Sequence, residues 1–132
     1  MITNYHPWLI KTKISLCSNG LLYFNSNVQN FLHKFGTFCS LSFSIDGDKD
    51  LHDMCRKDLN GNGTYDRAMS AILDYHKKTN SVLTTKMTLS PQNVHLSSNA
   101  IIDLIQHGFT EIFVNCIYEE GWTYEYGTIL YN

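Results

Sequence analysis

The sequence has no excess of basic side chains. It holds 10 Lys and Arg against 12 Asp and Glu, which gives a formal net charge of -2 and a pI near 6.3. Proteins that bind nucleic acid or anionic membranes by electrostatics concentrate positive charge on one face or in one segment. The composition therefore argues against a nucleic-acid partner.

Long apolar runs and targeting signals are also missing. No apolar segment approaches the ~20 residues that a membrane-spanning helix needs. The first residues, Met1 to Trp8, do not place an apolar run after a basic segment, as a secretory signal does. These absences predict a cytoplasmic protein with no membrane partner.

Cysteine motifs are absent as well. The cysteines are widely spaced, and none belongs to a CxxC or CxxxCxxC arrangement: Cys17, Cys39, Cys55 and Cys116. Isolated cysteines in a reducing compartment are usually free thiols that pack as small apolar side chains. We expect four free thiols, three of them in or beside strands as small buried residues, and no preformed metal site.

What the sequence does contain is an alternation of two apolar patterns. Short β-branched and apolar runs predict strands at 13–17, 39–45, 81–89 and 111–116. Between them, apolar residues at three- and four-residue spacing predict a helix at 25–35 capped by Asn25, Ser26 or Asn27, a second after a Thr64 cap to about 78, and a third from a Ser97 or Ser98 cap up to Gly108. Residues 48–64 are expected to be irregular, and 123–132 to begin another helix.

This order of elements defines the fold class. Strands that alternate with helices over 132 residues predict one α/β domain with a parallel sheet and right-handed crossovers. Four such strands form either a small open sheet or an arc of a larger (β/α) barrel. Periodicity does not separate these two architectures.

Polar side chains follow each predicted strand. The second strand ends in Ser44-Ile45-Asp46-Gly47, and Asn19, Thr88 and Asn115 stand at the ends of the others. Parallel α/β folds bind ligands at this carboxyl edge, where strand ends and helix N-termini converge. For any single strand end, the simpler interpretation is a turn; the combination favours a binding rim.

The polar stretch 48–64 offers several further candidates. Asp58-x-Asn60-x-Asn62-Gly63 matches the first half of a calcium loop, but Met69 stands where the bidentate glutamate belongs, so a turn is favoured. The pairs His52-Asp53 and Cys55-Arg56 fit a solvated loop better than an acid/base or thiolate cluster. Arg56 suits a ligand carboxylate or phosphate, or else a surface salt bridge to Asp53 or Asp58.

Three segments stand out: Ile14 to Leu22, Ser42 to Gly47 with His52-Asp53 and Arg56, and Asn60 to Asp66. They resemble the second part of the radical S-adenosylmethionine (AdoMet) enzyme core, and KMTLSP and NCIYE at 86–91 and 115–119 extend the resemblance. The similarity covers nearly the whole chain. It is closest to peptide maturases and anaerobic sulfatase maturases, within them to those associated with CXXX-repeat peptides.

The resemblance implies a fold, a cofactor and a site. The fold would be the third to sixth strands of a partial (β/α)6 TIM-like barrel, and the substrate a peptide or protein. Ser44 and Arg56 match the serine and arginine that hold the methionine end of AdoMet. Asp46, Asn19, Thr88 and Asn115 would line the same cavity.

The sequence departs from this family at the cluster. The CxxxCxxC motif that binds its [4Fe-4S] cluster, and the glycine-rich motif of its second strand, are absent. We therefore expect a single partial core domain over 1–132, a fragment without the first two strands and inactive alone. The alternative is a non-catalytic α/β binding or assembly module derived from that core. Open sheet edges would promote self-association.

Overall fold

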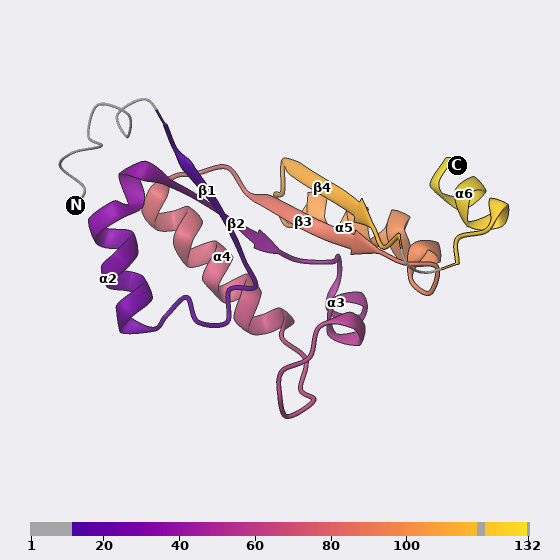
Figure 1. Ribbon diagram of the computed structural model, residues 1–132, viewed down its shortest axis with the longest axis horizontal. Coiled ribbons are helices and arrows are strands. Elements are labelled where there is room, and N and C mark those ends of the chain that lie inside the picture. The colour runs from indigo at the N-terminus through magenta and orange to yellow at the C-terminus, as the bar shows by residue number, and fades with distance from the viewer. Residues whose placement is uncertain (1–11, 119–120, 132) are drawn as a thin grey trace.

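The computed structural model describes residues 12–118 and 121–131. Within them, one parallel sheet has the strand order β1-β2-β3-β4. The strands are β1 (Ile14–Ser18), β2 (Cys39–Ser44), β3 (Thr84–Leu89) and β4 (Glu111–Cys116). Figure 1 shows them side by side in chain order, from indigo to orange. The predicted strand 111–116 has its bounds confirmed, and the other three are confirmed to within a few residues.

Helices connect successive strands. The longer ones are α2 (Ser26–Phe35), α4 (Tyr65–Thr79) and α5 (Ser97–Gln106), and a shorter one is α3 (Lys49–Cys55). A further short helix, α6 (Tyr124–Tyr131), follows β4. Two 3-10 turns, η2 (Gly36–Phe38) and η3 (Val94–Leu96), precede β2 and α5. Asn25 caps α2, because its side chain accepts the Asn27 N–H, and this confirms one of the three predicted caps.

Among the described residues, the core lies on one face of the sheet. Side chains alternate between faces along a strand, and the set that includes Phe43 and Ile45 of the β2 segment packs on α4. Met87 and Leu89 of β3 pack on Ala100 of α5, which lies behind β3 and β4 in Figure 1. The helices that cover β2 and β3 therefore share one side.

The opposite face of the sheet carries mostly polar side chains and is at least partly open to solvent. We call it the helix-free face; its members are Ser15, Cys17, Ser40, Ser42, Ser44, Thr84, Lys86, Thr88, Glu111, Phe113 and Asn115. Strands in chain order with their helices on one side form an arc of a (β/α) barrel, whereas a doubly wound sheet has helices on both sides. The structure thereby separates the two architectures that the sequence left open.

The structure corrects four local expectations. Residues 48–64 are not irregular throughout, because the Asp48 side chain accepts the Leu51 N–H at 2.9 Å and starts α3. Thr64 stands just before α4 but its side chain does not cap the helix, and α5 follows η3 directly, so neither predicted serine caps it. All four cysteines are free, as expected, but of the three in or beside strands only Cys39 is buried, since Cys17 is exposed and Cys116 is half-buried.

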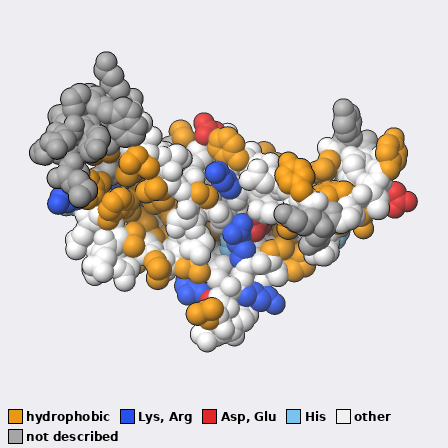
Figure 2. All heavy atoms as spheres, viewed as in Figure 1, with side chains coloured by type: hydrophobic (Ala, Val, Ile, Leu, Met, Phe, Trp, Pro, Cys, Tyr) orange, Lys and Arg blue, Asp and Glu red, His pale blue; other side chains and the backbone are white. Residues whose placement is uncertain are grey.

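The lengths of the helices and the distribution of surface charge are clear from the same described residues. None of the helices seen there is long and apolar enough to cross a membrane. On the face in Figure 2, Lys and Arg side chains are scattered in small groups, and the described part of that face has no continuous basic patch.

Candidate active site

The aspartate that follows β2 is buried at the junction of two strand ends. Asp46 is 1% exposed, and its Oδ1 accepts the backbone N–H of Thr88 in β3 at 2.8 Å. The chain can turn away directly afterwards because Gly47 has a φ of +126°, a conformation that only glycine adopts readily. The carboxylate thus joins the ends of β2 and β3.

Arg56 lies against this carboxylate. Its Nε–H donates to Oδ2 of Asp46 and its Nη2 donates to Oδ1 at 3.0 Å, so the pair is bidentate. The guanidinium side chain is 29% exposed, whereas the Asp46 side chain is 2% exposed. A guanidinium has five N–H donors, and only two of them are used by Asp46. The remaining edge is available to a ligand.

A buried asparagine that sequence reasoning missed supports the same region. Asn93 is 2% exposed, and its Oδ1 accepts the Ser90 N–H at 2.7 Å. Its Nδ2 donates to the Thr88 carbonyl at 3.3 Å and to the Cys55 sulfur at 3.5 Å. Asn93 therefore fixes the end of β3 against the end of α3. In the sequence, Asn93 is marked out by its position just after Ser90-Pro91, and that position is equally typical of a residue in a turn.

Three of the predicted site residues share the helix-free face. The register pairs Ser44 with Lys86 and Thr88 with Asn115, so these side chains lie in adjacent rows near the carboxyl ends of β2, β3 and β4. Ser44 is half-buried, and its hydroxyl lies 3.6 Å from the Cys17 sulfur. The structure brings Ser44, Thr88 and Asn115 onto one open surface.

Asn19 faces a different hollow. Its Oδ1 accepts the Leu21 N–H at 3.2 Å, which closes the turn after β1. The hollow beside it has a volume of about 540 Å³ and is bounded on its other side by Lys57, Asp58 and Arg67. Asn19 thus serves a turn, and nothing in its contacts connects it with Asp46 or Arg56.

The two alternative partners of Arg56 are engaged elsewhere. Asp53 Oδ1 accepts the Tyr65 N–H at 2.8 Å and so caps α4. Asp58 Oδ1 accepts the N–H groups of Asn60 and Asn62, which closes the turn that the sequence favoured over a calcium loop. These backbone bonds, with the charge of Arg67, lower the pKa of Asp58. The predicted surface salt bridge of Arg56 is wrong, since its partner is the buried Asp46.

The described side chains do not fit an iron-sulfur cluster. Among the residues that the structure places, no three His, Cys, Asp or Glu side chains gather closely enough to hold a metal ion. Cys39 is buried beneath the sheet, whereas Cys17 lies on the helix-free face and Cys55 ends α3. A [4Fe-4S] cluster needs several thiolates around one point, so we derive no chemical step through such a cluster.

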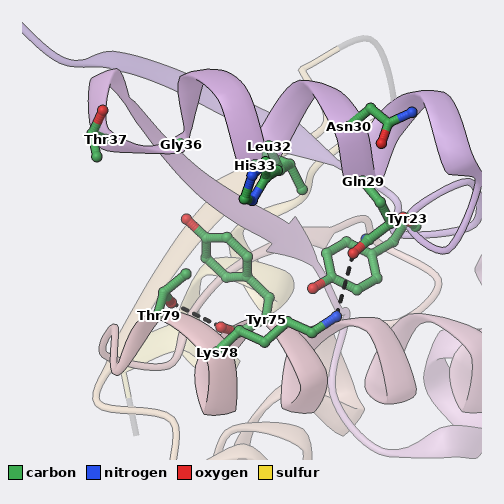
Figure 3. A pocket seen from close by; sticks show the side chains of 10 residues that line it. All are labelled: Tyr23, Gln29, Asn30, Leu32, His33, Gly36, Thr37, Tyr75, Lys78 and Thr79. Atoms are coloured by element: carbon green, nitrogen blue, oxygen red, sulfur yellow. Dashed lines mark hydrogen bonds between the residues drawn. The ribbon is translucent and has the colours of Figure 1, made fainter.

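A groove between α2 and α4 lies on the helix-covered side (Figure 3). Its volume is about 550 Å³, and Tyr23, Gln29, Tyr75 and Lys78 point into it. The Tyr23 hydroxyl donates to Asp74 at 2.7 Å, and Asp74 also pairs with Lys78 at 2.7 Å. Burial, with the bond to Asp74, raises the pKa of Tyr23 to about 12. These polar groups satisfy one another and tie the two helices together.

The fold resembles that of several solved proteins. The chain forms a parallel (β/α) arc with polar strand ends on its helix-free side, and its structural neighbours are radical AdoMet proteins with a barrel of this kind. One solved structure with this fold is native anSMEcpe, an anaerobic sulfatase-maturating enzyme, with bound AdoMet and Cp18Cys peptide. It matches with a TM-score of 0.67 and 22% identity, over 86% of this chain and 32% of that chain.

Two further solved structures give the same result. Native anSMEcpe with bound AdoMet and Kp18Cys peptide matches with a TM-score of 0.66, and His6-tagged anSMEcpe with bound AdoMet matches with 0.67, each at 24% identity. The chain spans only about a third of these proteins, 32% and 31% respectively. No protein-family description and no curated protein sequence matches the chain. The resemblance read from the sequence motifs is confirmed at the level of the fold.

Proposed function

We propose that this chain is part of a cytoplasmic radical AdoMet enzyme that modifies a peptide or protein, and that it carries the part of the pocket that holds the methionine end of the cofactor. In this assignment the chain corresponds to the third to sixth strands of the barrel. The solved proteins with the same fold have AdoMet bound, two of them together with a peptide. Their ligands support the proposed cofactor and substrate class.

The observation that carries the proposal is the arrangement of Arg56. A buried carboxylate fixes one edge of its guanidinium and leaves the other edge partly exposed at the end of β2. A preset cationic fork loses little side-chain entropy when it binds a carboxylate. The free N–H groups of Arg56 therefore suit the carboxylate of the methionine moiety.

Most of the other predicted residues take supporting roles in this proposal. The Ser44 hydroxyl, which lies on the helix-free face at the end of β2, would bind a carboxylate or ribose oxygen of the cofactor. Thr88 and Asn115 would line the cavity beside it, whereas Asn19, which faces a separate hollow, takes no part in this proposal. Asp46 would orient Arg56 without touching the cofactor, because Arg56 and Thr88 already occupy its oxygens.

AdoMet supplies the radical chemistry when an electron reaches it from a cluster. The described residues provide no ligand set for that cluster. Our proposal therefore assigns binding and orientation to this chain, and expects it to be inactive by itself in reductive cleavage. Reconstitution with iron and sulfide should leave the isolated chain without a stoichiometric cluster, and a full complement of cluster absorbance would contradict this assignment.

Calorimetry with AdoMet tests the pocket directly. Ser44→Ala and Arg56→Lys should each weaken binding roughly 10- to 100-fold, the range for hydrogen bonds to charged groups. Arg56→Lys keeps the charge but loses the bidentate fork. Arg67→Gln is the matched control, since Arg67 pairs with Asp58 near the surface, and it should bind like the wild type.

The outcomes separate the two hypotheses about this chain. Binding that Ser44→Ala and Arg56→Lys weaken, and that Arg67→Gln leaves unchanged, supports a retained pocket. No binding by the folded wild-type chain contradicts the proposal and favours a non-catalytic binding or assembly module. Arg67→Gln is the one substitution of the three that removes a charge, so weakening by Arg67→Gln without weakening by Ser44→Ala or Arg56→Lys would mean that AdoMet binds through general electrostatics, which also contradicts the proposed site.

A further inference from the structure

Thr64 occupies a helix-capping position without capping the helix. It precedes α4, where threonine commonly accepts a bond from the first helical turn. In this protein the Asp53 carboxylate accepts that bond instead, from the Tyr65 N–H. Asp53 packs so closely on Gly63 that a β-carbon there would lie 2.6 Å from its Oδ1. The Thr64 hydroxyl is buried and donates to the Arg56 carbonyl at 3.1 Å. It therefore serves another purpose than helix capping.

His52 continues this contact toward the end of β2. It is 1% exposed, its Nε2 lies 3.1 Å from the Thr64 hydroxyl, and its Nδ1 accepts the Asp46 N–H at 3.3 Å. A neutral imidazole that accepts at Nδ1 carries its proton at Nε2 and donates there. The bonds therefore run in one consistent direction, from the Asp46 N–H through His52 and Thr64 to the Arg56 carbonyl.

We propose that His52 and Thr64 are positioning residues that hold the backbone of Asp46 and of Arg56 and so fix the guanidinium for a ligand carboxylate. The path of hydrogen bonds joins the two main-chain segments whose side chains form the ion pair. This inference rests on the proposed AdoMet pocket for its functional consequence. The geometric part, control of the Arg56 guanidinium, stands on the contacts alone.

The path depends on a neutral histidine. Protonation at Nδ1 removes the acceptor of the Asp46 N–H. The carboxylates of Asp46 and Asp53 favour the protonated ring and Arg56 opposes it, while Tyr65 packs edge-on at 5.7 Å. Burial outweighs the carboxylates and lowers the pKa of His52. The path is therefore intact at neutral pH and opens when the pH falls through this lowered value.

Three variants test the inference. Thr64→Val removes the hydroxyl and keeps the shape, whereas Thr64→Ser keeps the hydroxyl. AdoMet affinity should fall about tenfold in Thr64→Val, the value of one net hydrogen bond, and recover in Thr64→Ser. Thr79→Val is the control, since the Thr79 hydroxyl likewise donates to a backbone carbonyl, that of Tyr75, but in α4 and exposed.

A second readout does not need AdoMet. The Arg56 Nε–H, held by Asp46, should give a distinct NMR resonance that is lost or shifted in Thr64→Val and in wild type at acid pH, but retained in Thr64→Ser and Thr79→Val. An unchanged resonance in folded Thr64→Val overturns the inference. Should Thr64→Val not fold, His52→Leu takes its place, because leucine supplies neither the acceptor for the Asp46 N–H nor the donor toward Thr64.

The two readouts distinguish the two proposals. If the wild type binds no AdoMet but the resonance responds as expected, the proposed pocket fails and the positioning role stands. If the wild type binds AdoMet and both Thr64 variants bind equally well, His52 and Thr64 are only structural and the positioning role fails. An affinity loss in Thr64→Ser as large as in Thr64→Val also contradicts the role of the hydroxyl.

Discussion

Loss of Arg56 should destabilise the protein far more than loss of an ordinary surface arginine. Arg56→Gln leaves the Asp46 carboxylate buried with the Thr88 N–H as its remaining partner. Removing one member of a buried ion pair typically costs 3–5 kcal/mol. Because the Arg56 side chain is 29% exposed, water can reach part of the vacated space. We therefore expect the lower end, about 3 kcal/mol.

A double-mutant cycle separates this effect from simple truncation. Asp46→Asn together with Arg56→Gln removes the buried charge while the asparagine oxygen still accepts the Thr88 N–H. The double variant should thus be more stable than Arg56→Gln alone, by about 1–2 kcal/mol. Urea unfolding followed by circular dichroism measures the free energies of unfolding of the wild type, the two single variants and the double variant, provided that the m-values agree.

The matched control is again Arg67→Gln. The pair of Arg67 with Asp58 is 2.8 Å long and its arginine side chain is 51% exposed, so its loss should cost less than about 1 kcal/mol. The reasoning is refuted if Arg56→Gln costs no more than this control. It is also refuted if the two single losses simply add in the double variant, since no coupling would then exist between Asp46 and Arg56.

Three further predictions follow from the same structure. Gly47→Ala should lower the free energy of unfolding by about 3 kcal/mol, because φ is +126° and the new β-carbon would overlap that of Ala100. Gly61→Ala, with φ +80° and open space around it, should lower the free energy of unfolding by about 1 kcal/mol, and urea unfolding measures both. Stability should fall as the pH drops below about 6.5, since the unfolded chain binds the proton that buried His52 resists, and His52→Gln should flatten this dependence. The outer edges of β1 and β4 are unpaired among the described residues, so sedimentation should show concentration-dependent association, and a single monomeric species would contradict it.

The sequence predicted most elements because their signals are local. In α2, the Asn25 cap and the apolar spacing agree, and in β4 a β-branched run has clear limits on both sides. The short helix α3 was missed for the opposite reason. It buries only Leu51 and His52, so its seven residues show no apolar period, and only the Asp48 cap marks its start.

The architecture was left open by the sequence because both candidates use the same local units. An open sheet and a barrel arc each alternate strands with crossover helices. What separates them is the order of strands and the side on which each helix packs, which depend on distant contacts such as Ala100 with Met87. The helix-free face likewise became visible only when Ser44 was aligned with Lys86 and Thr88 with Asn115.

The partner of Arg56 was the least predictable part of the site. Several aspartates were available, and the two nearest in sequence, Asp53 and Asp58, were the natural choices for a surface pair. Each of them satisfies backbone N–H groups that would otherwise lack a partner, at the start of α4 and in the turn at 58–62. Asp46 is more deeply buried than either, so its charge requires a counter-ion most. Arg56 therefore reaches back ten positions, and the same choice places its free edge at the strand ends, where the proposed ligand binds.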